Sequence, residues 1–129
     1  MRVLAFSDLH LDVAAAESIV AQRDDVDLIL GVGDFAQGHE GLAAYMELLE
    51  PLVPKAIYVP GNNETEKAVR AATSATVLHG ESVNFGGLTI SGLGCAVPPL
   101  PSLPWGSFDL SEDEAAAKLE GIAAADVLL

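Results

Sequence analysis

Short apolar runs alternate with longer mixed stretches in the first half of the chain. The runs are four or five residues long, which is typical of buried strands in a parallel sheet. They cover Arg2–Phe6, Val26–Leu30 and Ala56–Val59. Each run is followed by a stretch with helical spacing of its apolar positions, at residues 13–23, 41–50 and 65–72. Three strand–helix units in a row predict a parallel α/β sheet.

The pattern changes after residue 75. Three short strand-like pieces, at residues 76–78, 82–85 and 88–91, are separated by glycines and predict small hairpins. Residues 98–104 contain four prolines, which predict an irregular loop. A last helix is expected after Ser111, because Glu114 three positions later completes a capping box. Another apolar strand begins at residue 125, so we expect residues 1–129 to form a single but partial domain.

Composition and charge exclude several classes of partner. The chain has 6 basic and 19 acidic residues and a formal net charge of −13. Such a surface repels phosphate backbones and anionic lipids, so we expect neither general nucleic-acid binding nor membrane binding. Cys95 is the only cysteine, so this sequence cannot form an internal disulfide. No stretch is typical of a targeting segment or a membrane span, so a cytoplasmic protein is expected. The oligomeric state is left open.

Four polar residues follow the ends of the three predicted strands. Asp8 and His10 come after the first, Asp34 after the second and Asn62 after the third. The carboxyl ends of parallel strands meet at one edge of a sheet, where ligands bind in such folds. Asp8 and His10 are two apart, so in an extended backbone their side chains would point to the same side.

These side chains have the chemistry of metal ligands. A carboxylate beside an imidazole suits a divalent metal such as Mn²⁺, Fe²⁺ or Zn²⁺. Asp34 has two carboxylate oxygens and could bridge two cations, and Asn62 offers a neutral carbonyl oxygen to the second. Each residue also has an ordinary interpretation: Asp8 as a helix cap, His10 as a loop histidine, and Asn62 with Asn63 as a turn.

Three short segments in a fixed order carry a more specific signal. Residues 7–10 (Ser-Asp-Leu-His), 31–34 (Gly-Val-Gly-Asp) and 60–64 (Pro-Gly-Asn-Asn-Glu) each follow a predicted strand. They resemble the Asp-x-His, Gly-Asp and Gly-Asn-His-Asp/Glu signatures of the calcineurin-like metallophosphoesterase family. Residues 86–92 look like the central hairpin of that family. Spacing rules out the dinucleotide-binding and P-loop glycine patterns.

The resemblance implies a fold and a function. The fold would be an α/β sandwich of two sheets flanked by helices, truncated here after its first half. The function would be hydrolysis of a small phosphate mono- or diester at a two-metal centre with a bridging hydroxide. By the resemblance, Asp8 and His10 hold the first metal, Asp34 bridges, and Asn62 holds the second. Mn²⁺ is the expected metal, with Fe²⁺ or Zn²⁺ as alternatives. The remaining histidine ligands of the family would lie beyond Leu129.

The chain departs from the family at one position. The family commonly has a histidine where this chain has Asn63. An amide can donate a hydrogen bond but cannot act as a general acid, so Asn63 is expected to assist catalysis only as a donor. The alternative is a non-catalytic protein-interaction module on the same fold, and the fragment itself could be inactive. His39 could touch substrate or be solvated, His79 is expected to be structural, and Trp105 could cover the site or only pack.

Overall fold

The first sheet is parallel throughout, as the sequence predicts. The structure is a computed structural model that describes residues 1–129. Its first sheet has the order β1-β2-β3-β4, and every neighbouring pair is parallel. The strands are β1 (Val3–Phe6), β2 (Leu28–Val32), β3 (Ala56–Val59) and β4 (Thr76–Val77). The last of these corrects our prediction, because residues 76–78 do not form a hairpin and extend the parallel sheet instead.

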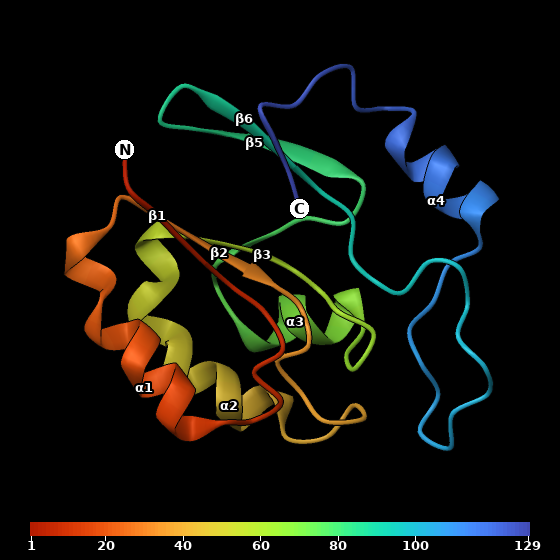
Figure 1. The fold of residues 1–129 in the computed structure, drawn as a ribbon, viewed down its shortest axis with the longest axis horizontal. Helices are drawn as coiled ribbons and strands as arrows, with labels where there is room; N and C mark the ends of the chain where they lie inside the picture. Colours follow the sequence, from red (N-terminus) through yellow and green to blue (C-terminus); the bar gives the residue numbers. More distant parts are fainter.

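Three helices cover one face of this sheet (Figure 1). They are α1 (Val13–Ala21), α2 (Leu42–Leu49) and α3 (Glu66–Ala72). Asp12 caps α1 and Thr65 caps α3, each through a side-chain oxygen that accepts a backbone N–H. Pro51 does not end the second helical segment outright. The chain continues as a 3-10 helix, η2 (Glu50–Lys55), because proline is tolerated in a first turn whose N–H groups are unpaired. A shorter 3-10 helix, η1 (Arg23–Asp25), follows α1.

The central strands are buried on both faces. In β2, Ile29 packs toward the helices, whereas Leu28 and Leu30 pack on the opposite side. Side chains alternate across a strand, so one apolar run supplies both cores. None of the helices has both the length and the apolarity that a membrane span requires.

A second, smaller sheet covers the other face of the central strands. The hairpin of β5 (Glu81–Phe85) and β6 (Leu88–Gly92) is antiparallel, as predicted, and β7 (Val127–Leu128) adds to β6 in parallel. Ile90 of β6 is fully buried against the first sheet. Between β6 and β7 the chain forms an irregular segment, residues 93–111, which we call the proline-rich segment, and then α4 (Glu112–Leu119). The predicted capping box of Ser111 and Glu114 is present.

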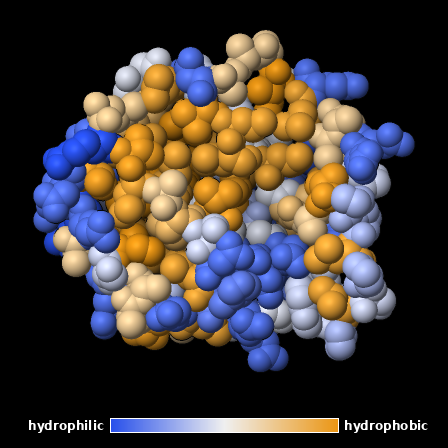
Figure 2. Space-filling model, viewed as in Figure 1, coloured by the Kyte–Doolittle hydropathy of each residue, from blue (hydrophilic) through white to orange (hydrophobic).

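β1 differs from its neighbours because only one of its faces is covered. Leu4 and Phe6 pack on the helical side, but Val3 on the opposite side is 47% exposed. Val32 at the end of β2 is 38% exposed. The second sheet packs on β2 and β3 and leaves this part open. Figure 2, viewed as Figure 1, shows a broad apolar area across the middle of the visible surface. The prediction that the first strand is fully buried is therefore wrong on one face.

Candidate metal centre

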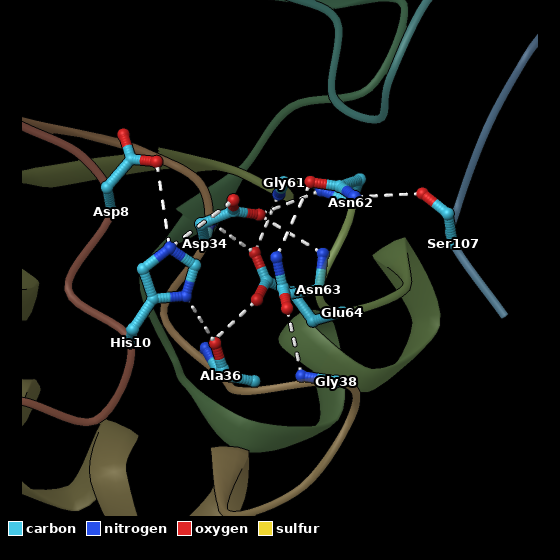
Figure 3. Close-up of polar contacts among 10 residues, drawn as sticks. All are labelled: Asp8, His10, Asp34, Ala36, Gly38, Gly61, Asn62, Asn63, Glu64 and Ser107. Atoms are coloured by element: carbon cyan, nitrogen blue, oxygen red, sulfur yellow. Dashed lines mark hydrogen bonds and ion pairs between the residues drawn. The ribbon is translucent and has the colours of Figure 1, made fainter. Parts of the chain in front are cut away.

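The loops after β1 and β2 bring three of the four predicted ligands, Asp8, His10 and Asp34, into one cluster (Figure 3). His10 Nε2 lies 3.7 Å from Asp8 Oδ1 and 3.8 Å from Asp34 Oδ2. One donor atom from each of these residues lies within 4.8 Å of the other two. The Asp34 side chain is 17% exposed, whereas Asp8 is 66% exposed and His10 37%. The cluster is therefore anchored in the protein at Asp34 and open to solvent at Asp8.

The imidazole of His10 is oriented by its second nitrogen. Nδ1 lies 3.2 Å from the carbonyl oxygen of Ala36, which can only accept a hydrogen bond. Nδ1 therefore carries the proton, and in the neutral ring Nε2 presents its lone pair to the two carboxylates. A hydrogen bond of this kind is the usual support of a metal-bound histidine.

The backbone at the cluster is left-handed, which corrects one sequence-based expectation. Asp8, His10 and Asp34 have φ values of 56°, 43° and 55°. The side chains of Asp8 and His10 thus do not converge through an extended backbone. Such a conformation costs roughly 1–3 kcal/mol per residue and is common at functional sites. It is held here by backbone bonds between the two loops, including His10 N–H to the Asp34 carbonyl at 3.0 Å.

Glu64 ties the second and third loops together, a role that the sequence did not reveal. Its side chain is 1% exposed, and its carboxylate accepts three backbone N–H groups. Oε1 accepts from Asp34 at 2.7 Å and from Gly61 at 2.6 Å, and Oε2 accepts from Ala36 at 3.0 Å. Burial raises the pKa of Glu64, although these three donors act in the opposite direction. Glu64 holds the frame of the site and does not point into it.

Two glycines let these loops touch through their backbones. Gly33 has a φ of +76°, and a Cβ at that position would lie 2.5 Å from the Cα of Gly61. A Cβ on Gly61 would lie 2.1 Å from Asp34 Oδ1 and 2.3 Å from the Asp34 nitrogen. Any larger residue would have to push the loops apart. Glycine at both positions therefore sets the distance between Asp34 and the third loop.

Asn62 lies beside Asp34, on the side away from His10. Asp34 Oδ1 accepts the backbone N–H of Asn62 at 2.9 Å and that of Asn63 at 3.1 Å. The side-chain oxygen of Asn62 occupies a position 3.2 Å and 3.3 Å from the two carboxylate oxygens of Asp34. The side-chain nitrogen of Asn62 donates to Ser107 Oγ at 2.8 Å. The amide group can also be placed the other way round, with its nitrogen donating to the two Asp34 oxygens and its oxygen accepting from Ser107 Oγ at 2.8 Å.

Asn63 is enclosed between the loops. Its side chain accepts the Gly38 N–H at 2.9 Å, and the residue is 6% exposed. Its Nδ2 lies 3.5 Å from the Asn62 side-chain oxygen, a long contact. Asn63 thus helps to hold the loop that leads to α2, and its amide nitrogen is the part directed toward Asn62.

The proline-rich segment, whose Trp105 could cover the site or only pack, returns to the loops around the cluster. Phe108 N–H donates to the Asn62 carbonyl at 3.0 Å, and Cys95 N–H donates to the Pro60 carbonyl at 3.0 Å. His39 Nε2 contacts the Gly106 carbonyl, and the His39 ring packs against Trp105 with the centroids 5.6 Å apart. These contacts give His39 and Trp105 packing roles in fastening the segment.

His79 is structural, as expected. It is 5% exposed, its Nδ1 accepts the Gly94 N–H at 3.2 Å, and its ring packs against Phe108. Burial lowers the pKa of His79, and the positive charge of Lys118 adds to this shift.

An open depression of about 410 Å³ adjoins the cluster at Asp8. Residues 5–8 and Val32 line it. A second hollow of about 400 Å³ lies between α2 and α3 and is lined mainly by alanine, away from the ligands. Of these two hollows, only the first is lined by one of the predicted ligands, Asp8.

The donor set fits a divalent cation on chemical grounds. Two carboxylates and an imidazole lone pair are acceptors directed toward one region, and acceptors at such distances repel one another without a positive charge between them. Oxygen donors with a single imidazole favour Mn²⁺, Fe²⁺ or Zn²⁺ over soft thiophilic metals.

Comparison with known proteins gives an independent result. The family model described as the calcineurin-like phosphoesterase superfamily domain matches residues 1–92. A search of curated protein sequences gave no match. Among solved structures, TT1561 of Thermus thermophilus is similar, with a TM-score of 0.76 and 18% identity. A second structure has a TM-score of 0.72 and 15% identity. Yfce, described as a phosphoesterase from E. coli, has a TM-score of 0.56 and 20% identity.

The similarity covers this chain more fully than it covers those structures. The first two matches span 94% of this chain but 61% and 63% of their own chains, and the third spans 80% and 64%. The chain thus corresponds to somewhat less than two thirds of each. At these identities the likeness establishes the fold, and it confirms the predicted α/β architecture.

Proposed function

Because the chain belongs to the calcineurin-like phosphoesterase superfamily, we propose that it contributes a two-metal centre that hydrolyses phosphate mono- or diesters. One observation carries the proposal: the donor atoms of Asp8, His10 and Asp34 lie within 4.8 Å of one another at the ends of adjacent strands. Asp8, His10 and Asp34 would hold the first cation, and Asp34 with Asn62 the second. Bound divalent cations supply Lewis acidity and a water activated at neutral pH.

The chain's own residues prepare the site for that chemistry. Ala36 fixes the His10 ring so that Nε2 is the donor atom. The N–H groups of Asn62 and Asn63 occupy Asp34 Oδ1, which directs Oδ2 toward His10. The strained backbone and the Glu64 carboxylate keep these groups in place before any ligand binds, so little reorganisation is needed.

Asn63 enters the proposal as a hydrogen-bond donor to a phosphoryl oxygen. Its amide oxygen is engaged by Gly38 and the residue is 6% exposed, so Nδ2 would have to turn away from Asn62 to reach substrate. Without a general acid at this position, esters with good leaving groups should react faster than alkyl esters. Mn²⁺ as the metal, the small phosphorylated substrate and the cytoplasmic location remain predictions.

The test combines metal binding with turnover. The purified chain is titrated with Mn²⁺ by electron paramagnetic resonance, and hydrolysis of bis(p-nitrophenyl) phosphate is then followed. We expect stoichiometric Mn²⁺ binding and turnover that fall to background in the double variant Asp8→Asn, Asp34→Asn. Glu17→Gln, which removes an exposed carboxylate on α1, is the control and should behave as wild type.

The two functional hypotheses differ in this experiment. A protein-interaction module on the same fold would bind no stoichiometric metal, and the double variant would then match the wild type. Metal binding without turnover would support the centre but place catalysis in doubt for residues 1–129 alone. The absence of both binding and turnover would refute the proposal.

A further inference from the structure

Two polar side chains of the proline-rich segment, Ser107 and Asp109, reach the candidate metal centre, and both lie outside residues 1–92, which the family model matches. Ser107 Oγ accepts a hydrogen bond from Asn62 Nδ2 at 2.8 Å and donates one to Asp109 Oδ1. Asp109 Oδ2 accepts the backbone N–H of Leu100 at 3.1 Å. Ser107 and Asp109 are both half-buried. Together they form a short chain of hydrogen bonds that ends on the amide of a proposed metal ligand.

The donor and acceptor groups fix the direction of each hydrogen bond between Asp109, Ser107 and Asn62. An ionised carboxylate can only accept, so the single hydroxyl proton of Ser107 must point to Asp109. Ser107 then has only lone pairs to offer Asn62, and the Asn62 group that faces it must be the NH₂. The amide oxygen of Asn62 is consequently turned to the other side, toward the carboxylate of Asp34.

The opposite orientation of the amide also forms hydrogen bonds. With the amide turned over, Nδ2 would donate to the Asp34 oxygens at 3.2 Å and 3.3 Å, and the amide oxygen would accept from Ser107 at 2.8 Å. That arrangement needs the Ser107 proton, which Asp109 already engages. It would also place an NH₂ group where a metal-binding oxygen is required. With the NH₂ of Asn62 toward Asp34 the site is closed to the second cation, and with the amide oxygen toward Asp34 it is open to that cation.

We propose that Ser107 and Asp109 are positioning residues that hold the Asn62 amide with its oxygen toward Asp34, ready to bind the second metal. This inference rests on the proposed function. Neither residue touches the metal; both act through Asn62. The backbone bond from Phe108 to the Asn62 carbonyl keeps the segment at the required distance.

Asp109→Asn should reverse the direction of the hydrogen bonds between positions 109, 107 and 62. The Leu100 N–H requires an acceptor, so Asp109→Asn would place its amide oxygen there and turn its NH₂ to Ser107. Ser107 would then donate to Asn62, and the Asn62 amide would turn over. Ser107→Ala removes the anchor, whereas Ser107→Thr keeps the hydroxyl. Ser102→Ala, an exposed serine of the same segment, is the control.

The first measurement needs no metal. Nuclear Overhauser effects from the Asn62 Nδ2 protons report which side the NH₂ faces. In wild type, Ser107→Thr and Ser102→Ala we expect contacts to the β protons of the side chain at position 107. In Asp109→Asn we expect contacts to the Asp34 β protons instead. Contacts to Asp34 in the wild type, or an unchanged pattern in Asp109→Asn, would overturn the proposal.

The second measurement is a Mn²⁺ titration followed by electron paramagnetic resonance. The dissociation constant of the weaker Mn²⁺ should rise about five- to tenfold in Ser107→Ala and Asp109→Asn, the size expected for one lost hydrogen bond, with the tighter Mn²⁺ unchanged. Equal affinities for the weaker Mn²⁺ in all variants would contradict the positioning role of Ser107 and Asp109. If the wild type binds no Mn²⁺, the proposed function fails, and the nuclear Overhauser pattern still decides the orientation of the amide.

Discussion

Residues 1–79 and residues 80–129 differ in how many of their hydrophobic residues are buried. All but two of the buried hydrophobic residues lie in the first region, and the exceptions are Ile90 and Ala115. The first region has a continuous core between the helices and the parallel sheet. The second packs one hairpin on that sheet and then runs over the surface to the candidate metal centre. The first region thus provides rigidity, whereas the second provides side chains that adjust the site.

The largest expected effect comes from the core of the first region. Leu49 is 1% exposed, and Leu49→Ala should lower the free energy of unfolding by about 2–5 kcal/mol. Val83 in the second region is only half-buried, so Val83→Ala should cost about 1 kcal/mol. Urea denaturation measures both. Equal losses would show that the hairpin is as much a part of the core as α2 is.

A smaller loss is expected at the carboxylate that joins the ligand loops. In Glu64→Gln, either orientation of the amide places its NH₂ against at least one backbone N–H, because both oxygens of Glu64 accept such groups. The free energy of unfolding should fall by about 1–3 kcal/mol. Thermal unfolding measured beside Glu17→Gln provides the matched control. If the two variants unfold alike, Glu64 does not hold the loops.

Substitution of Tyr58 should raise the free energy of unfolding, whereas the substitutions above lower it. Its hydroxyl is buried in the first region without a hydrogen-bond partner, and burial raises the pKa of Tyr58 far above its usual range. Tyr58→Phe removes this unpaired group while the ring contacts with Phe35 remain. The free energy of unfolding should rise by about 1 kcal/mol. A decrease in urea denaturation would mean that the hydroxyl contributes an interaction of its own.

The smallest effect concerns the link between the two regions and depends on pH. The pKa of His79 is lower in the folded protein than the ordinary value of 6.5, so the unfolded chain binds more protons below that pH. The stability from neutral His79 is present above pH 6.5 and is lost as the pH falls through the lowered pKa. Protonated Nδ1 can no longer accept the Gly94 N–H. The protection of the Gly94 amide, which is its intrinsic exchange rate relative to the observed rate, should therefore decrease as the pH falls below 6.5 and through the lowered pKa of His79.

A variant separates this titration from other acid effects. His79→Asn offers an amide oxygen in place of Nδ1 and does not titrate, so exchange at Gly94 should lose its conformational pH dependence. The exchange rates are corrected for intrinsic chemistry with an amide of β6. An unchanged dependence in this variant would assign the effect to another group.

The sequence predicted the elements of the first region because local pattern determines them. Buried parallel strands are short apolar runs, and the helical stretches between them are marked by the spacing of their own apolar positions. The rule that carboxyl ends of parallel strands meet was enough to bring Asp8, His10 and Asp34 together. The remaining features of this region, such as the pairing of β4, depend on long-range contacts. β4 has only two residues, so its pairing with β3 left no pattern to detect.

The missed parts of the site share one property. The left-handed backbone at Asp8 and His10 is held by hydrogen bonds to the loop after β2. Ser107 contacts Asn62 across 45 positions of the chain. Glu64 is visible in its motif, but its bonds to Asp34 and Ala36 require the folded loops. Such contacts depend on tertiary structure, which neither spacing nor propensity reports.

The backbone contact between Gly33 and Gly61 has a consequence for protein engineering. With no room for a methyl group at either residue, the spacing of the two loops cannot adapt to a new ligand side chain. A change of aspartate to glutamate at position 34 would lengthen the reach of the carboxylate by one methylene while its anchor stays fixed. Tuning the site for an ion of another radius should therefore rely on side-chain length and on the segment that carries Ser107, and leave the glycine pair untouched.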